Sequence, residues 1–220
     1  METVAPPATS PIPRGLFVLT LLYGGMTVLA GVLGFKQVAI GPLIVEAGIF
    51  SFLLLVVISS TIAQLYGDRT ANRLVLWGFV PLAVSVCLIG LVLFLPVSPD
   101  MPAANLNAFE TVLSQTPRIM AAGPVAYGVS LFLNVWIFSR LRGGGDSKTT
   151  GLMIRGAIAS ALSQAIDSVI FITLAFYGEF PIHDLLIGQI IAKVTLSFVL
   201  VPFLITGGVA LARRLDATAH

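Results

Sequence analysis

Six apolar runs of 20 to 28 residues divide the sequence, and four of them contain no charged residue. A helix that crosses the hydrocarbon core of a bilayer needs about 20 consecutive, mostly apolar residues. Unpaired backbone groups are so costly in lipid that such runs must be helical. The runs therefore predict six transmembrane helices, over Leu16–Phe35, Ala47–Gly67, Leu74–Leu95, Ile119–Ser139, Gly156–Gly178 and Leu185–Ala212.

The composition is that of a membrane protein. Hydrophobic residues make up 57% of the 220 residues and charged residues only 10%, whereas soluble domains carry about 25% charged residues. The mean hydropathy is +1.00. The net charge of +2 is small and the basic residues are scattered, which argues against nucleic acid as a partner. We expect an all-α integral membrane protein whose surroundings are the lipid bilayer.

Cysteine and histidine are too few to build a reactive centre. Cys87 is the single cysteine, so an intrachain disulfide is excluded. His183 lies in a predicted loop, and His220 ends the sequence. The sequence therefore predicts no metal site, no cofactor and no histidine-based catalysis.

Lysine and arginine lie mainly on one side of the predicted helices. Nine basic residues fall on the side of the two termini, and only Lys36 and Arg118 fall on the other. Loops rich in Lys and Arg remain in the cytoplasm, so we expect both termini there. The nine residues are Arg14, Arg69, Arg73, Arg140, Arg142, Lys148, Arg155, Arg213 and Arg214.

The runs leave little sequence for other domains. We expect a disordered cytosolic N-terminus over 1–13, a single six-helix transmembrane domain over 14–214 and a short cytosolic tail over 215–220. The 96–117 segment is too polar to span, and its stretch NAFETVLSQ predicts a short amphipathic surface helix. The last run is longer than a bilayer requires, so we expect it to tilt or to begin at the interface.

The fifth run carries a carboxylate, Asp167, at its midpoint. An ionisable residue at the bilayer centre costs roughly 2.5–3.5 kcal/mol on insertion scales and is typical of a functional site. Lys193 lies about eight residues into the sixth run, too deep to reach either surface. The structural alternative is a buried ion pair of Asp167 with Lys193 or with an arginine from a helix end. The functional and the structural interpretations both hold if a ligand inserts into the pair. Gln164, one turn before Asp167, could bind a ligand or orient the carboxylate.

The fourth and fifth runs share a pattern. "SLFLNVWIF" (130–138) and "SQAIDSVIF" (163–171) both have Ser, then Asn or Asp, then Ile-Phe at the same spacing. Asn134 thus corresponds to Asp167. The match is explained by chance, by polar residues that join helices, or by an internal repeat with a site at its interface, as in many transporters.

The remaining candidates have structural alternatives of equal weight. Arg118 could line a pathway or anchor its helix at the interface. Gln64 and Ser60 are uncharged and cheap to bury. Tyr127 and Phe171 could stack on a planar ligand, although aromatic residues near interfaces are usually anchors.

Glu46 lies near the start of the second run and could simply lie among the lipid headgroups. This leaves Asp167 as the only acidic residue expected at depth. An intramembrane enzyme would need a base or a nucleophile beside it, so the sequence argues against an enzyme.

Four stretches carry a resemblance to a known family. They are "VEAGIFSFLLLVVISSTIAQLYGDRTANRLVLWGF" (45–79), "PRIMAAGPVAYGVSLFLNVWIFSRLR" (117–142), "RGAIASALSQAIDSVIFITLAFYG" (155–178) and "KVTLSFVLVPF" (193–203). Together they resemble the queuosine precursor transporter family, also called the vitamin uptake transporter family. The resemblance covers about residues 40–205, and the fifth-run motif is its most specific part.

The resemblance implies a multi-pass protein of the bacterial cytoplasmic (inner) membrane. It also implies uptake of a small-molecule substrate, 7-cyano- or 7-aminomethyl-7-deazaguanine or a similar planar base. For such a base, Asp167 would accept hydrogen bonds from its N–H donors. Gln164 or Asn134 would bind the edge that has both donors and acceptors, and Lys193 or Arg118 would donate to its carbonyl oxygen. Aromatic side chains would lie against its faces.

The sequence departs from the family at carboxylate positions that are here Ser60, Gln64 and Asn134. Either the site binds a solute with fewer hydrogen-bond donors, or the family uses those positions to couple transport to its energy source rather than to recognise the solute.

Two modes of action stay open. The chain could transport the base by itself, with protons moving through Asp167. Alternatively it is the substrate-binding membrane subunit of an ATP-driven importer, with a separate energising module, since it lacks a phosphate-binding G-x-x-x-x-G-K-[ST] motif.

A third class, a structural scaffold, is open as well and would tolerate neutral residues in place of Asp167 and Lys193. The small residues Ala30 and Gly34 are spaced to dock a partner helix or a second copy, which allows a homo-oligomer.

Overall fold

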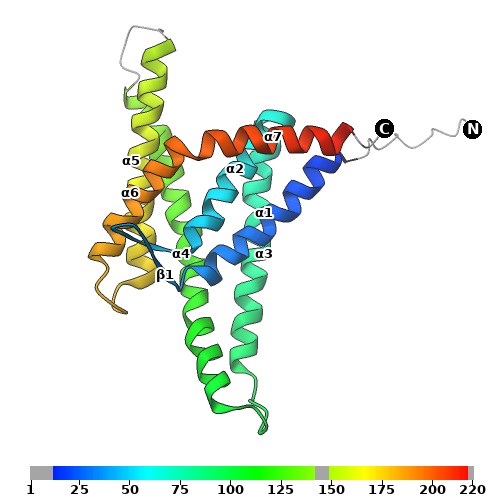
Figure 1. The fold of residues 1–220 in the computed structure, drawn as a ribbon, viewed down its shortest axis with the longest axis vertical. Coiled ribbons are helices and arrows are strands. Elements are labelled where there is room, and N and C mark those ends of the chain that lie inside the picture. The colour runs from blue at the N-terminus through cyan, green and yellow to red at the C-terminus, as the bar shows by residue number, and fades with distance from the viewer. Residues whose placement is uncertain (1–11, 142–148, 218–220) are drawn as a thin grey trace, which may run out of the picture.

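Each apolar run forms helix in the computed structural model of the protein, which describes residues 12–141 and 149–217 (Figure 1). Its helices are α1 (Arg14–Leu33), α2 (Gly48–Tyr66), α3 (Asp68–Phe94), α4 (Ala103–Leu141), α5 (Thr149–Phe176), α6 (His183–Val199) and α7 (Val201–Ala217). Strands β1 (Gln37–Ile40) and β2 (Leu43–Glu46) lie between α1 and α2. We expected an all-α protein, and the structure differs in having one β-hairpin.

The hairpin folds back against the protein. Its antiparallel register pairs Gln37 with Glu46 and Ile40 with Leu43. Gly41 adopts φ +57 in the turn, a left-handed conformation that glycine takes without steric cost. Strand β2 packs on α6, and Gly188 makes this close approach possible because a side chain there would collide with the Ile44 carbonyl.

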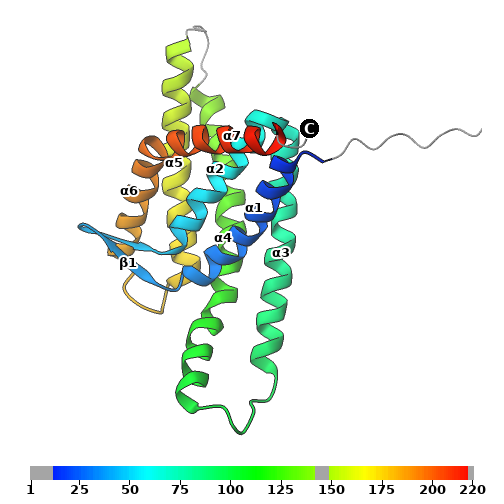
Figure 2. The same ribbon diagram turned by 45° about the vertical axis from the view of Figure 1, so that its right-hand side comes forward.

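Helices α3, α4 and α5 run along the long axis of the molecule, and α7 runs across it (Figures 1 and 2). The expected separate surface helix within 96–117 is not found. Instead α4 begins at Ala103 and continues for 39 residues through Pro117 and Pro124. An interior proline removes one backbone hydrogen bond, and the surrounding residues are good enough helix formers to carry the helix past both.

The last apolar run is broken rather than simply tilted. Helix α6 ends at Val199, α7 starts at Val201, and their axes differ by 51°. Pro202 lies directly after the break. Its ring clashes with the carbonyl four residues earlier and it has no N–H to donate, which favours a break or bend of the helix at this point.

Among the described residues, α1, α2 and α3 are each long and apolar enough to cross a membrane. The α6–α7 pair qualifies as a fourth, bent span. Large apolar side chains cover the outside of these helices, and Trp77 and Phe203 are 66% and 74% exposed. Such a surface suits lipid rather than water. Six spans and their orientation stay predictions.

Both ends of the described chain lie on the same side of the molecule. The Gly15 N–H donates to Asp216 Oδ1 and the Tyr66 hydroxyl donates to Asp216 Oδ2, both at 2.7 Å. Asp216 thus joins the start of α1 to the ends of α2 and α7. Which side of the membrane this is stays a prediction, as do the proposed domain limits.

Two buried apolar clusters flank the centre of the molecule. The first joins α1, α2, α3 and α7 and includes Tyr23 and Ile62. The second joins α4, α5 and α6 and includes Ile119 and Ile172. The side chains of Tyr23 and Ile119 also line the cavity described next, which therefore lies between the two clusters.

Candidate functional site

A cavity of about 160 Å³ lies where α1 to α6 converge. Its wall is mostly apolar or aromatic, with a few polar side chains. An apolar cavity of about 150 Å³ in another protein holds benzene, so this cavity has room for one small ring system. The polar residues that line it are Tyr23, Thr27, Glu46, Ser59, Tyr127, Asp167 and Lys193.

Asp167 and Lys193 form a buried ion pair on this wall. Nζ of Lys193 donates to Oδ2 of Asp167 at 2.7 Å, and the two residues are 3–5% exposed. The pair links α6 to α5. The structure thus forms the ion pair that the sequence suggested, and both partners border the cavity.

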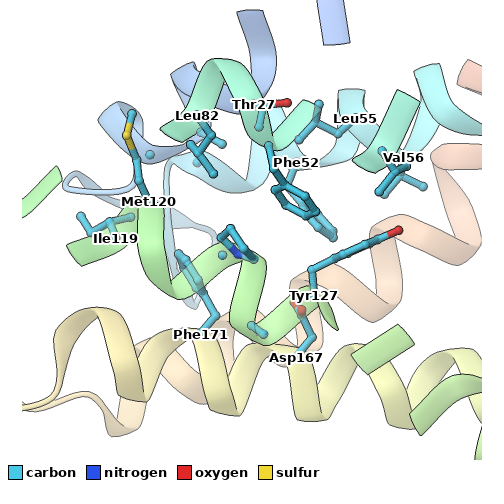
Figure 3. A pocket seen from close by; sticks show the side chains of 18 of the residues that line it. Thr27, Phe52, Leu55, Val56, Leu82, Ile119, Met120, Tyr127, Asp167 and Phe171 are labelled. Carbon is cyan, nitrogen blue, oxygen red and sulfur yellow. The ribbon is translucent and has the colours of Figure 1, made fainter. Parts of the chain in front are cut away.

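Aromatic rings surround this pair. Nζ of Lys193 lies 4.3 Å from the centroid of the Phe52 ring and 5.7 Å from that of Phe171. Figure 3 shows Asp167 and Phe171 pointing from α5 into the space that Phe52 of α2 borders, with Tyr127 of α4 beside them. Tyr127 also packs edge-on against Phe79, with centroids 6.3 Å apart. The site therefore combines a carboxylate and an ammonium with flat apolar surfaces.

Glu46 is a second buried carboxylate at the same cavity, and the expectation that it lies among the headgroups is wrong. It ends β2 and is 3% exposed. Gln189 of α6, which is fully buried, donates from Nε2 to Glu46 Oε1 at 2.7 Å and accepts from the Glu46 backbone N–H at 3.2 Å. The hairpin carries Glu46 inward, so Asp167 is not the only acidic residue at depth.

The other carboxylate oxygen of Glu46, Oε2, is buried and has no hydrogen-bond partner among the described residues. Burial raises the pKa of Glu46, which lies in the hairpin outside the spanning helices. The Lys193 ammonium, the Gln189 amide and the Gly48 backbone N–H lower this pKa by less. The Gly48 N–H is near the carboxylate but does not reach hydrogen-bond geometry with Oε2.

Gln164 and Arg118 hold helices together beside the cavity and do not line it. Oε1 of Gln164 accepts from the Ser197 hydroxyl at 2.8 Å, which joins α5 to α6. Arg118 of α4 donates to the carbonyls of Leu174 and Tyr177 at 2.8 and 2.7 Å. These contacts fix the C-terminal end of α5, where orphan carbonyls need donors.

Gln64 and Ser60 of α2 also lie off the cavity lining, Gln64 being exposed and Ser60 half-buried. The same helix instead contributes Phe52 and Ser59. Neighbouring positions on a helix point about 100° apart, which is why Ser59 lines the cavity and Ser60 does not. The side chain of Asn134 lies outside the described residues, and its role stays a prediction.

Sequence reasoning missed Glu46, Phe52 and Gln189 as a group around the ion pair. One signal for Glu46 was present. Gly41-Pro42 separates two short apolar segments, QVAI and LIVE, and a two-residue glycine turn between such segments is a hairpin pattern. Within the described residues no group of three or more metal-ligating side chains occurs.

The family described as "Putative vitamin uptake transporter" matches residues 46–207, well over half of the chain. The chain belongs to this family. One relative is the probable queuosine precursor transporter of Bacillus subtilis (strain 168). It is 28% identical to this chain over 193 residues, which cover 86% of this chain and 81% of the relative. No solved structure matches the chain.

The family match and the apolar helices of the chain identify the protein as a membrane transporter and not an enzyme. A transporter binds a small-molecule substrate and lies in a lipid bilayer. The family match begins at Glu46 and extends past Lys193, so it includes both carboxylates and the ammonium at the cavity.

Proposed function

We propose that this transporter takes up 7-cyano- or 7-aminomethyl-7-deazaguanine, or a similar planar heterocycle, across the bacterial cytoplasmic (inner) membrane. The observation that carries the proposal is the buried Asp167–Lys193 pair on an aromatic-walled cavity. The name of the Bacillus subtilis relative supports the substrate class.

The pair suits the edge of a guanine-like base. Such a base presents adjacent N–H donors with a carbonyl oxygen beside them. A carboxylate accepts from N–H groups and an ammonium donates to a carbonyl. Insertion of this edge between Asp167 and Lys193 exchanges one ion-pair contact for several hydrogen bonds, and neither charge is left unpaired in the apolar interior.

The faces of the base suit the rings around the pair. Phe52, Phe171 and Tyr127 border the cavity from three helices. Stacking on an aromatic ring contributes about 1–3 kcal/mol per base in other systems and tolerates different bases. We propose that these rings supply affinity, whereas Asp167 and Lys193 select the hydrogen-bonding edge.

The other predicted residues have indirect roles in this proposal. Gln164 holds α6 beside Asp167 through Ser197, and Arg118 anchors the end of α5. Both position the helices that carry the pair. We further propose six crossings with cytoplasmic termini, as the distribution of lysine and arginine predicts.

Uptake by the chain alone tests the mode of action. Proteoliposomes that contain only this protein should accumulate the labelled base, and empty liposomes should not. Tight binding by the purified protein without uptake would instead indicate the membrane subunit of an ATP-driven importer.

A ligand panel tests the substrate class. In thermal-shift measurements on purified protein, both deazaguanines should stabilise the fold, because a ligand that binds only the folded state raises its stability. Adenine, which presents the opposite edge chemistry, should not. A response to another heterocycle with none to the deazaguanines would overturn the substrate and leave the family assignment intact.

A further inference from the structure

We propose that Glu46 is the proton-binding residue of this transporter and that its proton crosses the membrane together with the ligand. The inference rests on the proposed transport function and adds the source of energy to it. It assigns coupling to the hairpin rather than to Asp167.

The charges at the cavity do not balance without a proton. Asp167 and Glu46 are two carboxylates, and Lys193 is the one ammonium that lines the cavity. Lys193 donates to Asp167, whereas the hydrogen-bond donor to Glu46 is the neutral Gln189 amide. An isolated carboxylate is expensive to bury and tends to be neutralised by a proton.

The space around Oε2 of Glu46 is large enough for a proton but not for a hydrated metal ion. Its exposed area is below 1 Å², although Glu46 belongs to the cavity wall. The oxygen lies against two glycines, Gly34 and Gly48, near the backbone carbonyl of Ala30. A divalent cation would need six or more oxygen ligands, which this enclosed space does not supply, whereas a proton needs no such ligand set.

The groups that face Glu46 leave it as the site that can change charge. From α6 these are Gln189 and Lys193, and from α5 it is Asp167. The backbone of Ala30 in α1 and the backbone of Gly48 in α2 also lie near the Glu46 carboxylate. Asp167 and Lys193 are ion-pair partners at 2.7 Å, whereas Glu46 has no ion-pair partner within 4 Å among the described residues, which favours Glu46 as the residue that takes up the proton.

The transfer balances simply. A proton from the outer water bonds to Oε2 and converts the carboxylate to a neutral carboxyl, with no net charge left on the site. The loaded site then opens inward, the O–H bond breaks, and the proton passes to cytoplasmic water with the ligand. Coupled transport requires that protonation favour the ligand-bound state, so affinity should rise as the pH falls.

The test uses Glu46→Gln, a neutral isostere that keeps an acceptor for Gln189. Glu110→Gln, on the exposed first part of α4, is the matched control. The probe is 7-cyano-7-deazaguanine, which has no amine that titrates in the range studied.

In proteoliposomes, an inward proton gradient should drive accumulation by the wild type and by Glu110→Gln. Glu46→Gln should lose the accumulation that the proton gradient drives, yet still exchange internal for external probe at equal pH. Accumulation by Glu46→Gln equal to that of the wild type would overturn the proposal, as would accumulation driven by a sodium gradient instead.

Binding measured between about pH 5 and pH 8 separates coupling from ligand contact. Wild-type affinity should fall as the pH rises, and that of Glu46→Gln should stay high throughout. Loss of binding by Glu46→Gln at every pH would make Glu46 a ligand contact and overturn the proposal.

The proton site can be tested apart from the proposed substrate. If the wild type binds no deazaguanine, the substrate proposal fails, but the thermal stability of ligand-free protein still reports on Glu46. A pH dependence that disappears in Glu46→Gln supports proton binding there. The same pH dependence in both proteins refutes it.

Discussion

Lys193 of α6 donates a 2.7 Å hydrogen bond from Nζ to Oδ2 of Asp167 on α5, and both side chains are buried at the edge of a cavity. Buried ion pairs contribute little net stability, but loss of one partner leaves an uncompensated charge. An ion pair that borders a cavity also gives a ligand an acceptor and a donor together. This relationship underlies the predictions on binding below.

Asp167→Asn and Lys193→Met should each destabilise the protein, and the double variant should be more stable than either single variant. The reason is that each single change strands one buried charge, at a cost of about 3–5 kcal/mol, whereas the double change leaves none. Denaturation in mild detergent measures this, with the exposed Asp184→Asn as control. Additive losses in the double variant would show that the two residues do not act as a pair.

Phe52→Leu should weaken ligand binding about tenfold, because a base–aromatic stack contributes about 1–3 kcal/mol. The ring lies 4.3 Å from Nζ of Lys193 and lines the cavity, so its loss also removes a cation–π contact. Binding isotherms measure the change. Phe94→Leu, at a ring that is 87% exposed, should bind as the wild type does, and equal affinity in both variants would argue against stacking on Phe52.

The stability of the ligand-free protein should decrease as the pH rises, through Glu46. Since burial raises the pKa of Glu46 in the folded protein, its stabilising contribution is complete below the unfolded value of about 4.3. That contribution is lost as the pH rises through the raised folded pKa. Thermal melts across this range should show the loss in the wild type and not in Glu46→Gln, which should be the more stable of the two at neutral pH.

Gly188→Ala should destabilise the protein and displace the hairpin, since its side chain would collide with the Ile44 carbonyl. The collision is with backbone, which cannot rotate away. Gly90→Ala is the control: it lies in a helix with open space around it, where alanine stabilises by roughly 0.5–1 kcal/mol. Comparable melting temperatures for both variants would contradict the close packing of β2 on α6.

The helices were predictable because long apolar runs in lipid have one backbone solution. The pairing of Asp167 with Lys193 was predictable for a related reason: these are the only charges within the six runs, and buried charges seek partners. The break between α6 and α7 was harder to foresee. Pro202 is visible in the sequence, but a proline can end, kink or merely weaken a helix, as Pro117 and Pro124 show in α4.

The position of Glu46 was not predictable from hydropathy. An acidic residue at the edge of an apolar run is compatible with two chain paths. The chain can emerge into the lipid headgroups, or it can fold back into the protein interior. The difference arises from the hairpin and from Gln189, which lies 143 residues away and donates to Glu46 Oε1. Hydropathy describes each run separately and therefore holds no information about such a contact.

The most direct test of the central claim is a binding titration of purified protein with 7-cyano-7-deazaguanine, comparing the wild type with Asp167→Asn and with the exposed control Asp184→Asn. We predict saturable binding by the wild type and by Asp184→Asn, and a loss of at least about tenfold in Asp167→Asn, since hydrogen bonds to a buried charge contribute roughly 1.5–3 kcal/mol. No binding by the wild type, or undiminished binding by a folded Asp167→Asn, would contradict the account.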